Sequence, residues 1–127
     1  MKYEIAWDGD PEDVLITTSG DATVEDLHAM AREVMADPRF RDGLTALIDH
    51  TDTRWWALSN QGLEARAEGI RADAGRLGRQ RIAVVVGSPL DFGIGQTVMA
   101  LLAEGVEFET EIFESRTAAR DWLRRGQ

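Results

Sequence analysis

The segment "RIAVVVGSPLDFGIG" at residues 81–95 joins the two elements from which the fold is best recognised. Its first half, 81–87, contains an unbroken apolar run, which is typical of a central strand covered on both faces of a sheet. Ser88 then has the position of a helix N-cap, with Pro89 as the first helical residue and Asp91 completing a capping box. We therefore predict a helix after this strand, with a buried side made of Leu90, Ile94, Val98 and Leu101.

The N-terminal part of the chain predicts a hairpin followed by a helix. Residues 3–7 and 13–19 read as strands, and the turn-forming segment "DGDPE" between them makes a β-hairpin the natural connection. Thr23 has the position of an N-cap, and the apolar stripe that follows it stops before Pro38.

The rest of the chain alternates strands with helices. Residues 44–49 predict a buried strand, and Ser59 caps a second helix with the apolar stripe Leu63, Ala67, Ile70, Ala74 and Leu77. Residues 106–113 alternate between apolar and acidic side chains, as expected of an edge strand. Ser115 caps a last helix that can dock through Ala118, Ala119, Trp122 and Leu123.

This order predicts an α/β fold. Strands that alternate with helices over short connections imply a mostly parallel sheet with right-handed crossovers. We expect a single domain over residues 1–127, with one mixed five-stranded sheet, an N-terminal β-hairpin and four helices.

Charge and composition narrow the classes of function. The chain of 127 residues has a formal net charge of −9, which disfavours binding to nucleic acid because the phosphate backbone is also negative. No cysteine is present, so the chain has no disulfide, thiolate metal site or thiol nucleophile. The sequence shows no signal peptide and no segment able to span a membrane, so we expect a cytoplasmic protein without integral membrane association.

The chain resembles the SpoIIAA-like family, which is related to the STAS domains of anti-sigma-factor antagonists. The resemblance covers nearly the whole length and rests on three segments: "DPRFRDGLTALID" before the third strand, "RIAVVVGSPLDFGIG", and the closing "ARDWL". It implies a STAS-like fold that binds proteins or nucleotides rather than one that catalyses a reaction. The group is also compared with SEC14-like lipid-binding domains.

The resemblance also implies a candidate phosphorylation site. Regulatory STAS proteins carry a phosphorylated serine in an Asp-Ser-Ser-Gly-Leu type of motif, at the start of the helix after the third strand. Here the nearest segment is "SNQGL" at 59–63, in which the acceptor position falls on Asn60, which cannot be phosphorylated. Ser59, one residue earlier, is the alternative acceptor for a partner-switching regulator.

Two segments at the ends of neighbouring strands predict a binding crevice. Ligands of open α/β sheets bind beyond the carboxyl ends of the parallel strands, where "DHTDTRWWAL" (49–58) and "GSPLDFG" (87–93) follow the third and fourth strands. Together they would gather Asp49, His50, Asp52, Trp55, Trp56, Ser59, Ser88 and Phe92. The leading hypothesis is a small apolar ligand or a protein partner bound near Trp55 and Trp56. The alternative is that one tryptophan fills the core and the other covers a helix.

Catalytic and metal chemistry are less favoured by the same residues. Asp49, His50 and Asp52 are too close in sequence to supply three ligands easily, and Asp49 can instead hydrogen-bond its own loop, so we expect neither a metal nor a cofactor. Ser88 lacks a nucleophile-elbow pattern and is explained by its N-cap role. An enzyme that uses Asp49, His50 and Ser88 is therefore the weakest hypothesis.

Small residues in two helices predict close packing. Gly93 and Gly95 fall inside the third helix, where glycine usually marks the close approach of another backbone or a ligand. In the second helix, a strip of small residues lies beside the apolar stripe: Gly62, Ala65, Gly69 and Ala72. The strip favours either close packing against another helix, which could belong to a second subunit in a homodimer, or an exposed surface with tolerated glycines.

Overall fold

The computed structural model describes residues 1–55, 60–102 and 106–126. The elements follow the predicted order: β1 (Lys2–Trp7), β2 (Val14–Asp21), α1 (Val24–Ala36), β3 (Thr45–Arg54), α2 (Asn60–Leu77), β4 (Arg81–Val86), α3 (Pro89–Leu101), β5 (Glu109–Phe113) and α4 (Arg116–Arg125).

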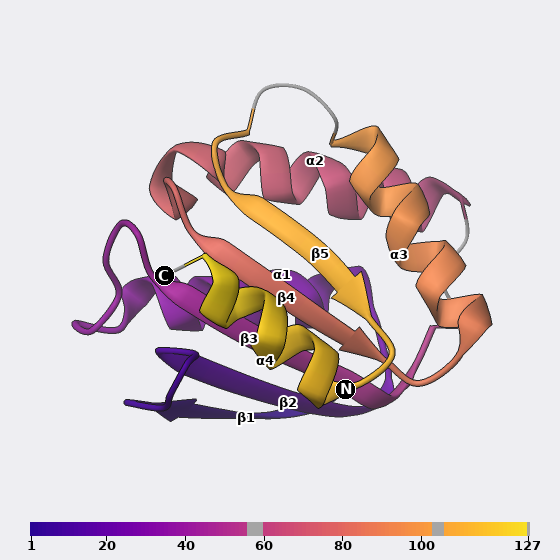
Figure 1. Cartoon of the computed structure of the whole chain (residues 1–127). Coiled ribbons are helices and arrows are strands. Elements are labelled where there is room, and N and C mark those ends of the chain that lie inside the picture. Colours follow the sequence, from indigo (N-terminus) through magenta and orange to yellow (C-terminus); the bar gives the residue numbers. More distant parts are fainter. Residues whose placement is uncertain (56–59, 103–105, 127) are drawn as a thin grey trace.

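The five strands form one mixed sheet in the order β1-β2-β3-β4-β5. β1 pairs with β2 in antiparallel fashion, and the other three pairings are parallel. Each parallel crossover advances by one strand in the same direction, so right-handed connections place α1, α2 and α3 on one face of the sheet. α4 returns across the other face and packs against β3, β4 and β5 (Figure 1). The predicted α/β fold, with its N-terminal hairpin and four helices, is confirmed.

Three of the predicted helix caps have the expected geometry. The side-chain oxygens of Thr23, Ser88 and Ser115 each accept a hydrogen bond from the backbone N–H three residues later, at 3.1, 3.1 and 3.2 Å. A cap of this kind satisfies an N–H group that has no partner within the helix, so these residues fix where α1, α3 and α4 begin. The cap predicted at Ser59 lies outside the described residues.

Two strand boundaries differ from prediction by three residues or more. β3 continues to Arg54, so residues 50–54 are strand rather than loop. This polar extension is held by pairing with the far end of β2, after a register shift between Thr17 and Ser19, and by an ion pair between Arg54 and Asp21. β5 is shorter than predicted: it begins at Glu109, opposite the first residue of β4.

The buried side of α3 was predicted only in part. Val98 is buried, but Leu90 is 75% exposed and Leu101 is 37% exposed, so the prediction that these two leucines are buried was wrong. Gly95 explains why α3 turns a different side toward the sheet than predicted, because a Cβ at this position would collide with the side chain of Ile112 in β5. The helix therefore turns Gly95 and Val98 inward and leaves both leucines outside.

The small-residue strip of α2 has a partner within the same chain. A Cβ at Gly69 would collide with the imidazole of His28 in α1, so this glycine allows the two helices to approach closely. Ala65 and Ala72 are exposed. Packing inside the chain therefore accounts for Gly69, and the homodimer stays a prediction.

The two faces of the sheet carry different cores. The face covered by α4, here called the α4 face, holds a closed cluster of Leu47, Ala83, Val85, Ala119 and Leu123, each no more than 1% exposed. The opposite face, here called the cavity face, carries two separate clusters. One joins α1 to β2 and β3, and the other joins α2 to α3.

Candidate functional site

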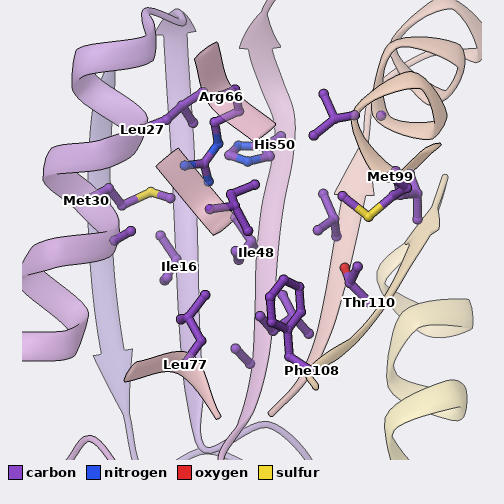
Figure 2. Close-up of a pocket in the computed structure, with 18 of the residues that line it drawn as sticks. Ile16, Leu27, Met30, Ile48, His50, Arg66, Leu77, Met99, Phe108 and Thr110 are labelled. Carbon is purple, nitrogen blue, oxygen red and sulfur yellow. The ribbon is translucent and has the colours of Figure 1, made fainter. Parts of the chain in front are cut away.

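A cavity of about 170 Å³ lies on the cavity face, between the sheet and helices α1, α2 and α3. Its wall is largely aliphatic and aromatic, with contributions from four strands and all three helices (Figure 2). α2 makes its backbone contacts mainly with α1 and α3, which leaves room beneath it for the cavity. Small-molecule sites are also typically concave and mostly apolar with a few polar groups, although most are larger than this cavity.

His50 reaches the cavity from β3. The residue is 5% exposed, and its Nδ1 lies 2.5 Å from the hydroxyl of Thr18 on the neighbouring strand β2. That hydroxyl also pairs with the hydroxyl of Thr53. Burial, helped by the nearby positive charge of Arg66, lowers the pKa of His50 to about 3, so the imidazole is neutral at physiological pH.

Arg66 reaches the same end of the cavity from α2, and Figure 2 shows its guanidinium close to His50. The side chain is half-buried, and burial lowers its pKa to about 10 while the negative charge of Asp73 opposes that shift. The guanidinium therefore remains charged at neutral pH in a largely apolar wall. Arg66 was missed as a site residue, although its position inside the apolar stripe between Leu63 and Ile70 was a visible signal.

Three further side chains add polar groups to the wall of the cavity. Trp55 is half-buried, and its ring meets that of His50 edge to face, with centroids 4.8 Å apart. The Nε2 of Gln80 is buried without a hydrogen-bond partner among the described residues, as is the Nε1 of Trp55. Asp91 contributes a carboxylate from the first turn of α3, where the helix dipole favours negative charge.

Asp49 lies on the other side of the sheet from His50, because successive side chains of a strand point to opposite faces. One carboxylate oxygen accepts hydrogen bonds from the backbone and hydroxyl of Thr51, and the other pairs with Nε of Arg116 on α4 at 2.5 Å. Burial acts to raise the pKa of Asp49, but the hydrogen bonds from Thr51 and Arg116 outweigh it and lower the pKa below its usual range.

The two predicted rim segments are neighbours where the structure describes them. His50 pairs with Val86 across β3 and β4, and a Cβ at Gly87 would collide with the carbonyl oxygen of Thr51. Of the predicted site residues, His50 and Trp55 line the cavity together. Trp56 and Ser59 lie outside the described residues, so phosphorylation of Ser59 and binding of a protein partner stay predictions.

The remaining predicted residues lie elsewhere. Ser88 serves as the cap of α3, Phe92 is half-buried on the first turn of that helix, and Asp52 is exposed at the end of the sheet. Because Asp49 points toward α4, His50 points into the cavity and Ser88 bonds to its own helix, these three side chains do not converge. Among the described residues, no three histidine, aspartate or glutamate side chains group in a way that could hold a metal ion.

In a comparison with protein families, the chain matches the SpoIIAA-like model over residues 14–124. The chain belongs to the SpoIIAA-like family. Among solved structures it is similar to an uncharacterised DUF3478-family protein with a SpoIIAA-like fold from Shewanella loihica PV-4. The two are 18% identical, with a TM-score of 0.61 over 95% of this chain and 93% of the other, so the likeness concerns the fold. No curated protein matches the sequence.

Membership of the SpoIIAA-like family identifies the chain as a STAS-like module, a class that is generally regulatory rather than enzymatic. In the part of the SpoIIAA-like chain that the structure describes, no helix has the length and hydropathy needed to cross a bilayer.

Proposed function

We propose that this protein is a binding module whose ligand is a small apolar molecule held in the cavity beside Trp55. The observation that carries the proposal is the cavity itself, which has a volume of about 170 Å³, is partly open and is lined largely by apolar side chains. For scale, an engineered apolar cavity of about 150 Å³ binds benzene. The ligand is therefore expected to have a compact or medium-length hydrocarbon part.

The energetics favour occupancy by an apolar molecule. Apolar surface that a ligand buries against this wall contributes roughly 25 cal/mol per Å², part of which offsets the entropy lost on binding. Water is a poor competitor, because a bound water needs two to four polar partners and the wall offers few.

Titration with a panel of fatty acids and isoprenoid alcohols tests the proposal. Trp55 lines the cavity, whereas Trp7 lies under Arg39 and Trp122 packs against Phe113, so a bound ligand should change the emission of Trp55. The change should disappear in Trp55→Phe. A ligand that binds the folded state should also raise the melting temperature with its concentration. A panel in which no compound changes either signal would refute the proposal.

Filling the cavity from within gives a sharper test. Val84 lines the cavity, and Val84→Phe is expected to weaken ligand binding at least tenfold because the ring occupies the space that the ligand needs. Leu90→Phe is the matched control, since Leu90 is 75% exposed on the outside of α3 and the added ring stays in solvent. Equal affinity in the two variants would place the ligand outside the cavity.

A further inference from the structure

Arg66 is a charged side chain that the fold itself does not explain. It occupies a position of α2 three residues after Leu63 and four before Ile70, within the stripe that faces the other helices and the cavity. Moving a charge out of water into such a wall is costly unless a partner compensates it. A residue of this kind in an apolar cavity is therefore expected to serve a ligand.

The described part of the chain supplies no ion-pair partner for Arg66. The arginines at 39, 41, 54, 81, 116, 120 and 124 each pair with a carboxylate, and Arg66 takes part in none of these pairs. Asp73 acts on it only from a distance, two turns further along the same helix. The carboxylate of Asp91 also lines the cavity, but it forms no ion pair with Arg66. The positive charge of Arg66 is thus left without a carboxylate in contact.

His50 provides a second polar group at the same place. Its Nδ1 is held by Thr18, and its Nε2 has no hydrogen bond to any described residue. The ring is neutral, so it contributes a hydrogen-bonding atom without adding a second positive charge. This end of the cavity therefore offers one full positive charge and one neutral hydrogen-bonding group.

We propose that the ligand is an amphipathic monocarboxylate, whose acid group pairs with the Arg66 guanidinium beside His50 while its apolar tail fills the cavity. This inference rests on the proposed function. A planar guanidinium matches a carboxylate through two parallel hydrogen bonds. A single negative charge balances a single arginine, whereas a neutral ligand leaves that charge uncompensated. The tail runs past Ile48 toward Leu77 and Phe108, the apolar residues further along the cavity (Figure 2).

Binding of octanoate and octanol, measured by calorimetry, tests the inference because the two share the same tail. The wild-type protein should bind octanoate roughly tenfold to a hundredfold more tightly than octanol, the range expected of charge-assisted hydrogen bonds. Arg66→Met should remove this preference and leave octanol binding unchanged. Arg66→Lys, which keeps the charge and loses the planar geometry, should retain part of the preference.

Arg76→Met is the matched control, since Arg76 is exposed near the end of the same helix, and it should leave both affinities unchanged. If wild type binds octanoate and octanol equally and Arg66→Met changes neither, the acid group is not recognised, while the apolar site stands. If neither compound binds, the proposed function fails as well. A preference for octanoate that survives Arg66→Met would assign the carboxylate to another residue.

Discussion

The helices that cover the two faces of the sheet pack against it in different ways. On the α4 face, a short helix covers the sheet with one continuous core cluster. On the cavity face, three helices pack largely against one another, and the core divides into two clusters with a cavity between them. The layer of three helices is therefore packed less continuously against the sheet than α4 is, and the proposed binding role of the cavity face rests on this difference.

Charges follow the same division. On the α4 face, Arg116 pairs with Asp49, and Arg120 makes a bidentate pair with Glu12, with its closest contact at 2.7 Å. On the cavity face, Arg66 has no such partner among the described residues. The half-buried Arg116 and Arg120 are thus matched to carboxylates on one side of the sheet, whereas the half-buried Arg66 is unmatched on the other. This contrast supports the proposal that the ligand carries an acid group.

The largest expected effect is a difference in the loss of stability between core substitutions on the two faces of the sheet. Leu123 on α4 is fully buried, so Leu123→Ala should lower the free energy of unfolding by about 2–5 kcal/mol. Ile94 on α3 borders the cavity and is half-buried, so Ile94→Ala should cost less than half as much. Urea denaturation of both variants measures the difference. Equal losses would mean that the cavity face is as tightly packed as the α4 face.

A smaller effect is expected from the charged pair on the α4 face. The side chain of Glu12 is 3% exposed, and Glu12→Gln leaves Arg120 without its counter-charge, at an expected cost of about 1–3 kcal/mol. Asp121→Asn is the control, because Asp121 and Arg124 form an exposed pair worth about 0.5 kcal/mol or less. Chemical denaturation should rank the two variants in this order, and a Glu12→Gln variant as stable as the control would contradict it.

Local sequence signals predicted most of the framework. The N-caps and the apolar strand at 81–86 can be recognised from a few consecutive residues. The order of elements then limits the possible strand arrangements, because parallel crossovers are right-handed. The extension of β3 could not be read in this way, because its polar residues become strand only by pairing with β2, more than thirty residues away. The exposed Leu90 was missed because α3 has apolar residues around its circumference, so its period selects no single buried face.

The candidate site was predictable in part. Strand alternation alone separates Asp49 from His50, so grouping them in one crevice ignored a rule that the sequence already supplied. Arg66 could have been found as the charged member of an apolar stripe. The absence of an ion-pair partner for Arg66 could not have been predicted, because it depends on where every distant carboxylate lies after folding.

The smallest expected effect uses pH to test whether His50 is buried against a positive charge. Its pKa is about 3 in the folded protein and about 6.5 when exposed, so the unfolded chain binds the extra proton and stability falls as pH drops below 6.5. Between pH 6.5 and 5.5 the loss should be about 1 kcal/mol. This window lies above the range in which the aspartates and glutamates titrate.

Denaturation at several pH values should show this slope of stability against pH in wild type and a flatter slope in His50→Gln. His28→Gln should show an intermediate slope, because burial lowers the pKa of His28 as well. The absolute stability of His50→Gln also reflects the lost bond to Thr18, so the slope is the readout. An unchanged slope in His50→Gln would mean that the imidazole titrates normally, in contact with water rather than enclosed beside Arg66.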